Sequence, residues 1–593
     1  MIATAPKPPD ELHAVLLFEK SRSILPNTSV IAWTPMNRRN FIRTSGISLL
    51  SLLTHKALGS SPLPKSGNTL GLPDGVTGRV KGQPVTMTKG GGSGWNYHDI
   101  NVSMQEAGEA LAVFLEAPSS TLSSITLHWR IPAVKPTSIM NDHWERTYGD
   151  VSWHRWSASE KLPWYFLEFD GRGTRGCGVK TGAKAFSAWQ VTNEELLLTL
   201  DTQNGGEGVT LGERVLSVAE IVTISSAEGE TPHSTAQRFM GMLCDHPRMP
   251  KDPVYGINDW YFTYGRNSKE LILAHTGLIA PLADGLDNRP FSVIDAGWFR
   301  TSAAASEDVA WSDDMGVPNS KFGDMHQVAE EIRRLGMRPG IWTRPLCGSS
   351  TDAPSRMLPV IHGRAEKEPV LDPSIPENLE RVRGLLRLYR EWGYELVKFD
   401  FTSFDIFGKW GFEMTKEGLM TDPGWHLHDR SRTNAEIVLD LYHAVRDGAG
   451  DAYVISCNTF GHLAAGIFEL NRIGDDTSGL EWDRTRRMGV NTLAFRGIHH
   501  GRFYAADPDC VGVTEKIAWE RNSRWLELVA RSGVPLFISA DPKATGTTQK
   551  AAIKGSFALA SRAQPLGEPL DWMERAVPEN WRFDGETEHF SWD

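Results

Sequence analysis

Between residues 253 and 541 the sequence repeats one pattern, in which a short apolar segment is followed by a polar stretch with helical periodicity. In the stretch 376–393 the apolar residues recur at helical spacing: Leu379, Val382, Leu385, Leu386 and Tyr389. The apolar segments are YGINDWYF (255–262), FSVIDAGWF (291–299), MRPGIWTRP (337–345), YELVKFDF (394–401), AYVISC (452–457), LNRIGDD (470–476), RFYAAD (502–507) and VPLFISAD (534–541). A doubly wound parallel sheet is one interpretation, but eight strand–helix repeats in ~290 residues favour a closed (β/α)8 barrel.

Residues 95–245 show a different pattern, in which runs of strand-forming residues alternate with turn signals and strong helical periodicity is absent. The runs are ALAVFLEA, SSITLHWR, WYFLEFDG, AFSAWQVT, ELLLTLDT and LSVAEIVTI. Such spacing predicts an antiparallel β-sandwich. A chain of 593 residues is too long for one core. We therefore expect a sandwich domain over 61–248, a barrel over 249–563, and a tail over 564–593 that packs back on the barrel.

The segment 36–60 has the layout of a twin-arginine signal peptide. Arg38 and Arg39 precede a moderately apolar run at 46–53, and small residues lie near 57–60. The run is much shorter than the ~20 residues of a membrane span, and no Cys follows it that would carry a lipid anchor. Residues 1–35 have no visible role, so we expect Met36 to be the start and the mature protein to be periplasmic or extracellular.

Composition excludes some partners and favours others. The net charge of −11 argues against nucleic acid or an anionic membrane as the main partner. The 21 Trp residues are about twice the average usage for this length, which favours carbohydrate binding because sugar faces stack on indole rings. The five Cys are widely spaced without a C-x-x-C pair, so neither a zinc site nor a disulfide scaffold is expected.

Nearly every predicted barrel strand ends in polar or aromatic residues, at the rim where barrel active sites lie. The candidates are Asn258, Trp260, Asp295, Trp298, Trp342, Arg344, Lys398, Asp400, Cys457, Asn458, Arg472, Asp475, Asp476, Asp507, Asp509 and Asp541. Like charges that converge on one rim are costly, so this many carboxylates indicate a site. For Asp507, Asp509 and Asp541, a helix cap or loop turn is an equally good interpretation.

Two carboxyl groups about 5–5.5 Å apart are what a retaining glycosidase needs. One attacks the anomeric carbon and the other protonates the leaving oxygen. Strands four and six are alternate neighbours in the predicted barrel, so Asp400 and Asp475 can face each other across its mouth. Lys398 lies two residues before Asp400 on the same strand face, where it can keep Asp400 ionised and bind sugar hydroxyls.

Five motifs occur in the order found in glycoside hydrolase clan D: VIDAGWF, GMRPGIW, VKFDF, RIGDD and GVPLFISADP. Over roughly 250–545 the chain most resembles the clan family (family 36) of bacterial α-galactosidases, plant raffinose synthases and seed-imbibition proteins. The resemblance implies double displacement with retention, and no metal or cofactor. It places the nucleophile on Asp400 and the acid/base on Asp475, with Asp476 as the alternative. It also places Asp295, Trp342, Lys398, Cys457 and Arg472 around the sugar.

The chain departs from its clan at two positions. Many of the α-galactosidases have two consecutive Asp where this chain has Asp295 and Ala296, which puts a preference for galactose in doubt. Many relatives have an acidic residue where Arg344 stands before Pro345. Arg344 can bind a substrate carboxylate, or form an ion pair with a residue such as Asp295 or Asp400.

We therefore predict a secreted, retaining α-galactosidase-like hydrolase that removes a terminal α-linked hexose from an oligosaccharide or glycoside. One alternative is a raffinose-synthase-like transglycosidase, or an α-glycosidase for another sugar. The other is a carbohydrate-binding protein without catalysis. The sequence identifies no oligomer interface.

Overall fold

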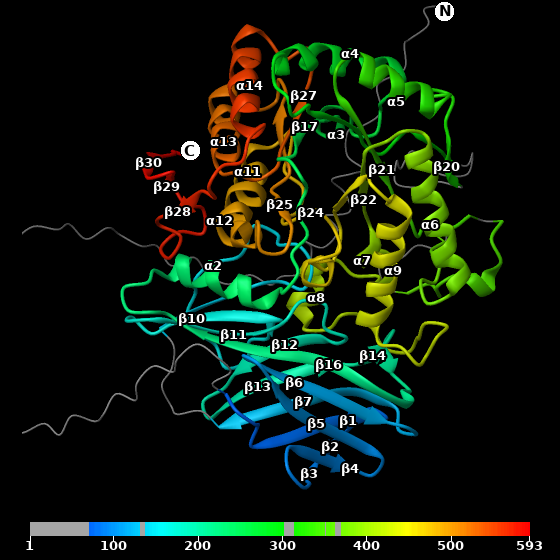
Figure 1. Ribbon diagram of the computed structural model, residues 1–593, viewed down its shortest axis with the longest axis vertical. Helices are drawn as coiled ribbons and strands as arrows, with labels where there is room; N and C mark the ends of the chain where they lie inside the picture. Colours follow the sequence, from blue (N-terminus) through cyan, green and yellow to red (C-terminus); the bar gives the residue numbers. More distant parts are fainter. Residues whose placement is uncertain (1–69, 131–136, 302–313, 350, 362–368) are drawn as a thin grey trace, which may run out of the picture. The chain divides into compact units, whose positions relative to one another are not determined.

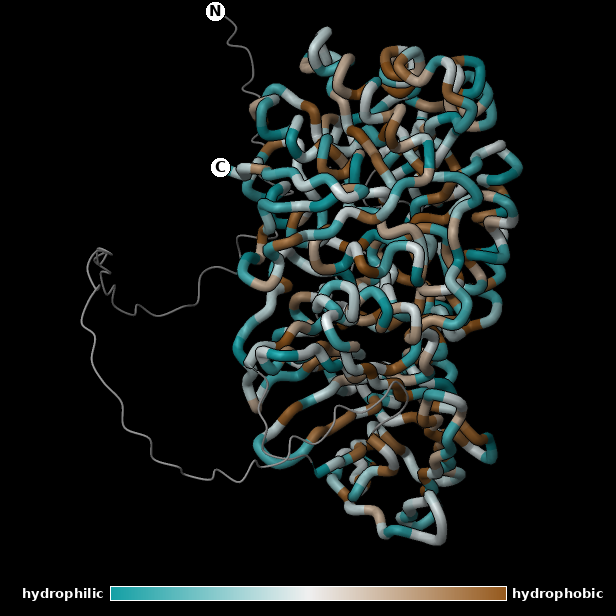
Figure 2. The backbone as a smooth tube through the Cα atoms, turned by 60° about the vertical axis from the view of Figure 1, so that its left-hand side comes forward, coloured by the Kyte–Doolittle hydropathy of each residue, from teal (hydrophilic) through white to brown (hydrophobic). Residues whose placement is uncertain are grey.

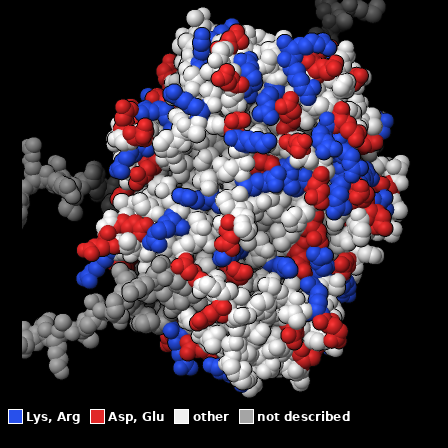
Figure 3. Space-filling model, in the orientation of Figure 1, with Lys and Arg blue, Asp and Glu red and all other residues white. Residues whose placement is uncertain are grey.

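The computed structural model describes residues 70–130, 137–301, 314–349, 351–361 and 369–593, so the predicted signal segment at 36–60 lies outside the described residues. Residues 63–593 form one compact unit. No helix within the described ranges is long and apolar enough to cross a bilayer. On the face drawn in Figure 3, basic and acidic side chains are interspersed.

Two antiparallel sheets make up the first part of this unit. One has the order β2-β1-β7-β13-β12-β9 and the other β3-β4-β5-β6-β16-β11-β10-β8. Their strands are β1 Gly75–Val80, β2 Gln83–Thr86, β3 Thr88–Lys89, β4 Gly94–Tyr97, β5 Ile100–Ala107, β6 Ala110–Ala117, β7 Leu122–Arg130, β8 Ser138–Asn141, β9 Leu162–Pro163, β10 Tyr165–Phe169, β11 Thr174–Val179, β12 Phe186–Val191, β13 Glu195–Asp201 and β16 Gly212–Ser225, with a small hairpin of β14 Gln203–Asn204 and β15 Glu207–Gly208.

Alternation of side chains explains why these segments form strands. In β13, Leu196, Leu198 and Leu200 are buried and the residues between them are partly exposed. A strand points successive side chains to opposite faces, so this period of two buries one face in the sandwich core. Helix α2 (Pro232–Leu243) follows the last strand, and the Thr231 hydroxyl caps its first turn by accepting from Ser234 N.

A parallel sheet of order β25-β24-β23-β22-β21-β18-β17-β27-β26 forms the second part. Its strands are β17 Tyr255–Asn258, β18 Phe291–Ile294, β21 Arg338–Thr343, β22 Leu396–Phe399, β23 Tyr453–Ser456, β24 Leu470–Arg472, β25 Ala505–Asp507, β26 Cys510–Val513 and β27 Leu536–Ala540. Between β18 and β21 the chain forms a hairpin of β19 Phe299–Arg300 and β20 Asp314–Pro318.

The seventh barrel strand is split into β25 and β26. The first half pairs with β24 and the second half with β27, so together they close the ring between strands six and eight. The break falls at Pro508 and Asp509, and Asp509 has a left-handed φ of 75°. The predicted fold class, a (β/α)8 barrel preceded by an antiparallel sandwich, is therefore confirmed, and the doubly wound sheet is excluded.

Helices surround the barrel strands, as Figure 1 shows for α4, α5, α6, α9, α13 and α14. The helices are α3 Trp260–Thr263, α4 Lys269–Ile279, α5 Met325–Arg334, α6 Pro376–Glu391, α7 Thr402–Phe407, α8 Gly411–Glu417, α9 Asn434–Ala449, α10 Gly461–Ala464, α11 Trp482–Thr485, α12 Thr492–Arg496, α13 Trp519–Arg531 and α14 Thr547–Ala560. Apolar segments lie mainly inside and hydrophilic ones mainly on the periphery (Figure 2).

The tail forms a three-stranded sheet of β28 (Glu568–Pro569), β29 (Asn580–Phe583) and β30 (Glu586–His589). Its aromatic side chains are buried: Trp572, Trp581, Phe590 and Trp592. The Trp572 ring lies 5.5 Å from Phe495 in α12, and Trp482 Nε1 in α11 donates to Trp592 O at 2.9 Å. The tail thus covers two short barrel helices.

Candidate active site

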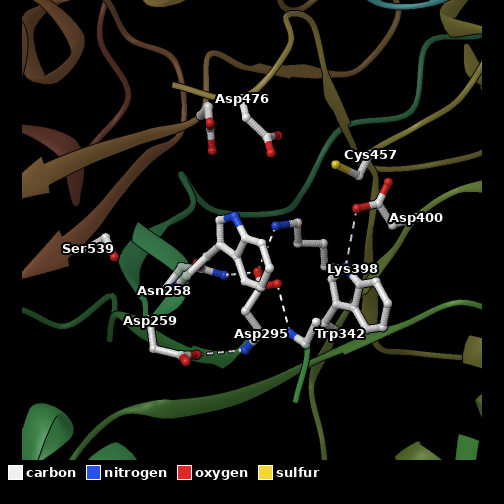
Figure 4. A network of polar contacts seen from close by, with 12 residues as sticks. Asn258, Asp259, Asp295, Trp342, Lys398, Asp400, Cys457, Asp476 and Ser539 are labelled. Carbon is white, nitrogen blue, oxygen red and sulfur yellow. Dashed lines mark hydrogen bonds and ion pairs between the residues drawn. The ribbon is translucent and has the colours of Figure 1, made fainter. Parts of the chain in front are cut away.

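A buried ion pair joins the ends of strands two and four. Lys398 Nζ of β22 donates to Asp295 Oδ2 at 2.7 Å, and Asn258 Nδ2 of β17 donates to the same oxygen at 2.7 Å (Figure 4). Burial lowers the pKa of Lys398, but Asp295 and neighbouring groups raise it by more, to well above its usual value. Lys398 therefore stays charged, and its hydrogen-bond partner is Asp295 rather than the expected Asp400.

Asp400 follows β22 directly and is only half-buried. Trp342 Nε1 donates to its Oδ2 at 3.3 Å, and Phe401 N donates to its Oδ1 at 2.8 Å. Phe401 has a left-handed φ of 66°, which is strained for a bulky residue and is the kind of strain found at functional sites. The turn therefore fixes the Asp400 carboxylate while leaving it accessible.

Asp475 and Asp476 follow β24 and lie in different environments. Arg146 and Arg484 both bind Asp475, at 2.8 and 2.7 Å, and its side chain is 5% exposed. Asp476 is bound by Arg472 at 3.0 Å, with Arg146 at 3.7 Å, and its side chain is 38% exposed. In Figure 4, Asp476 lies across the Lys398 ammonium from Asp295. Asp476 is thus the member of the pair that a ligand can reach.

The arginines control the charge of Asp476. Burial raises the pKa of this carboxyl, but Arg472, Arg146 and Arg484 together lower it by more, to well below its usual value. The ionised form is therefore favoured at neutral pH.

The split strand seven contributes two more buried carboxylates. Asp509 binds Arg472 at 3.0 Å and accepts from Thr477 N at 2.8 Å and from the Tyr261 hydroxyl. Asp507 accepts a hydrogen bond from Asp509 N at 3.0 Å. Burial raises the pKa of Asp507 to about 6, against the opposing charge of Arg472.

A cavity at the barrel axis is lined by the polar residues Asn258, Lys398, Arg472, Asp507 and Asp509. Its volume is about 10 Å³, room for no more than about one water. A sugar ring would therefore bind above it, at the mouth. Of the carboxylates that end strands two, four, six and seven, only Asp400 and Asp476 are not buried there.

Two other predicted residues, Cys457 and Trp260, differ in their burial. Cys457 is buried, with Arg472 and Arg146 within 3.7 and 3.9 Å of its Sγ, and burial raises its pKa well above the usual value, which makes it a poor nucleophile. Trp260 is half-buried at the start of α3.

The structure does not bring four predicted residues into the site. Trp298 is fully buried and donates to Trp342 O at 2.9 Å. Arg344 forms a fully buried ion pair with Asp405, so the structural interpretation of this arginine applies, with a partner that we did not expect. The remaining two have hydrogen-bond partners outside the site. Asn458 is buried against Ser403 and Glu145, and Asp541 holds its own turn by accepting from Lys543 N at 2.9 Å.

Arg146 and Arg484 are site residues that sequence reasoning missed. Arg146 follows the sandwich strand β8, and Arg484 lies in α11 beyond the strand-six motif. Nothing in the local sequence around Arg146 links it to the barrel rim. No group of three or more His, Cys, Asp or Glu side chains suited to a metal ion occurs in the described part of the chain.

No family model matches the sequence. Solved structures do match. The α-galactosidase of Thermus thermophilus, in complex with p-nitrophenyl α-D-galactopyranoside, is 17% identical with a TM-score of 0.56, over 86% of this chain and 98% of that chain. A second structure of the Thermus enzyme contains stachyose. The chain has an α-galactosidase fold.

Two further α-galactosidases support this resemblance. The family 36 enzyme of Geobacillus stearothermophilus, in complex with 1-deoxygalactonojirimycin, is 13% identical with a TM-score of 0.53, over 82% of this chain and 72% of that chain. The enzyme of Lactobacillus brevis is also 13% identical, with a TM-score of 0.52, over 82% and 70%. The resemblance to family 36 is thus confirmed at the level of fold.

Proposed function

We propose that this chain is an exported, retaining α-glycoside hydrolase of α-galactosidase type. The observation that carries the proposal is the pair of accessible carboxylates, Asp400 and Asp476, above a polar cavity at the mouth of the barrel. The shared fold supports it, because the similar structures are α-galactosidases in complexes with galactosides such as stachyose. Export rests on the twin-arginine segment alone.

Asp400 is the proposed nucleophile. Its oxygens accept from Trp342 Nε1 and Phe401 N, which fixes the carboxylate for attack on an anomeric carbon. Attack forms a glycosyl ester and expels the leaving-group oxygen, which must receive a proton from the second carboxyl. Water then cleaves the ester, and the second carboxylate removes a proton from that water.

We favour Asp476 over Asp475 as the second carboxyl. Both oxygens of Asp475 are taken by arginines, and its side chain is almost fully buried. Asp476 is open to the mouth, and its arginines keep it ionised, which is the form that the second step requires. In the first step a bound substrate has to raise its pKa so that it carries a proton.

Lys398, Asp295 and Asn258 form the proposed floor of the sugar site. Their polar groups are already paired with one another, so a sugar hydroxyl that approaches Lys398 meets a preorganised charge. Ala296 supplies no second carboxylate beside Asp295. We propose a terminal α-linked hexose as the substrate, with galactose as the first to test because the similar structures are α-galactosidases.

The direct test is Asp400→Asn. We expect hydrolysis of nitrophenyl α-glycosides to fall by about 10³-fold or more, with an unchanged circular dichroism spectrum and Tm. The matched control is Asp541→Asn, which changes the same group at the end of another barrel strand, where it holds only its own turn. An Asp400→Asn protein with most of its activity would refute the assignment, and so would an equal loss in Asp541→Asn.

A further inference from the structure

A second pocket lies outside the candidate active site. It is formed by the loops that follow β26 and β27, beside the first turns of α13 and α14. Its volume is about 270 Å³, close to the lower end of ligand sites, which span about 300–1,000 Å³. Thr514, Trp519, Asn522, Lys543 and Gln549 are among its lining residues, and it shares no residue with the cavity at the barrel axis.

Asn522, in the wall of this pocket, has a side-chain oxygen that accepts no hydrogen bond from the described residues. The residue is completely buried, and its Nδ2 donates to Gly512 O at 2.8 Å. That bond fixes the amide orientation and leaves Oδ1, in the wall of the pocket, without a hydrogen-bond partner among the described residues. Buried acceptors without a partner are rare, and each calls for an explanation.

Trp519 gives the pocket an apolar surface. It is the first residue of α13 and is half-buried, because part of its ring packs on the hydrophobic core. Gln549 lies opposite on α14, where its Oε1 accepts from Gly546 N at 3.1 Å and leaves the amide Nε2 as a donor. An aromatic ring beside amide donors and acceptors suits a ligand with one apolar face and several hydroxyl groups.

We propose that this pocket is a second carbohydrate site, which holds a neutral hexose unit against Trp519 while a hydroxyl donates to Asn522 Oδ1. An anion fits less well: Lys543 and two helix N-termini would attract it, but the buried polar atom is an acceptor and Glu515 also lines the pocket. Sugar binding at this pocket does not depend on hydrolysis. Only the choice of which sugars to test rests on the proposed function.

The pocket is also connected to the catalytic rim. The Thr514 hydroxyl in its wall donates to Gly479 O, and Gly479 lies just beyond the Asp475–Asp476 loop. A hydrogen bond thus joins the pocket wall to the segment after the acidic loop, and the proposal extends to a longer oligosaccharide whose distant end this pocket holds. We expect the pocket to affect oligosaccharide binding and not the turnover of a small aryl glycoside.

The test measures stachyose binding to the full-length chain by saturation-transfer NMR and calorimetry, in an Asp400→Asn background that prevents turnover. Trp519→Ala should weaken binding roughly tenfold or remove one of two binding events, while Trp519→Phe keeps most of it. The matched control is Trp156→Ala, a half-buried tryptophan of the sandwich. In the otherwise unchanged chain, Trp519→Ala should leave kcat and KM for p-nitrophenyl α-galactoside unaltered.

Equal stachyose binding by Trp519→Ala and Trp156→Ala would overturn the proposal. So would binding of inorganic phosphate that Lys543→Ala abolishes, without any effect of Trp519→Ala on the sugar. If the unchanged chain hydrolysed no α-glycoside, the proposed function would fail, but stachyose binding to that chain and to its Trp519→Ala variant would still test the pocket. The two failures are therefore distinguishable.

Discussion

At the residue scale, the neighbouring aspartates Asp475 and Asp476 differ in their ion pairs and in their exposure to solvent. Asp475 pairs with both Arg146 and Arg484. Asp476 pairs with Arg472, which also binds Asp509, and its side chain remains 38% exposed. A buried ion pair holds a loop in place, whereas a carboxylate that is accessible to solvent can exchange a proton with a ligand. Position in the chain alone does not separate these roles.

We expect Asp476→Asn to reduce kcat strongly for substrates with a poor leaving group, and much less for nitrophenyl glycosides, whose leaving group needs no proton. Added azide should restore turnover of the activated substrate, because a small anion replaces the missing base. Steady-state kinetics and NMR of the azide product check this.

Asp475→Asn is the matched comparison. It should lower Tm, because Arg146 and Arg484 lose their shared partner, and it should show no azide rescue. The opposite pattern, with rescue only in Asp475→Asn, would return the acid/base role to Asp475.

At the element scale, one segment of the sandwich is part of the barrel rim. Thr147 forms a β-bridge with Gly474, and Asp475 N donates to Thr147 O at 2.8 Å. The same segment is anchored where Arg496 of α12 pairs with Asp142. The loop that carries the candidate acid/base is therefore hydrogen-bonded to the sandwich part of the same compact unit.

This anchoring predicts that Arg146→Gln lowers kcat by roughly tenfold or more, with little change in KM for a small glycoside. Arg146 acts through the position and charge of Asp475 and Asp476. Arg146→Lys should recover part of kcat, because it keeps the positive charge. The control is Arg155→Gln, at an exposed arginine nearby in the sequence, and a loss equal to that of Arg146→Gln would contradict the role.

The elements also show what the sequence could predict. The eight strands were predictable, because buried parallel strands are short apolar runs between periodic helices, as in Leu396–Phe399 and Leu536–Ala540. The positions of Asp400 and of the Asp475–Asp476 pair at the rim were predictable because strand ends converge. The sequence favoured Asp475 of that pair, and the difference in exposure between the two depends on the surrounding arginines. Arg146 was not predictable, since its contact joins a sandwich segment to the barrel rim far along the chain. The burial of Trp298 and Arg344 was not predictable either, because it depends on packing between distant segments.

At the scale of the whole molecule, several histidines are buried in their neutral form. Burial lowers the pKa of His233 to about 4, and that of His275, His462 and His499 to about 3. In the unfolded chain these groups take up protons near pH 6.5. Below that pH the unfolded state binds more protons than the folded state, so stability is lost as the pH falls.

We therefore expect Tm to be nearly constant above pH 7 and to fall between about pH 6.5 and 4, with each buried histidine contributing about 1.4 kcal/mol per pH unit. Calorimetric scans across this range measure the slope. His275→Leu should make the slope shallower, and His326→Gln, at an exposed position, should leave it unchanged. A slope that His275→Leu does not alter would contradict this account.

The contact of Arg146 with the barrel rim limits how such a protein can evolve. A barrel that supplied all of its own counter-charges could be detached, recombined or fused to new partners without losing its chemistry. Here one cation beside Asp475 and Asp476 comes from the sandwich part of the chain, so the sandwich and the barrel have to be inherited, and engineered, together.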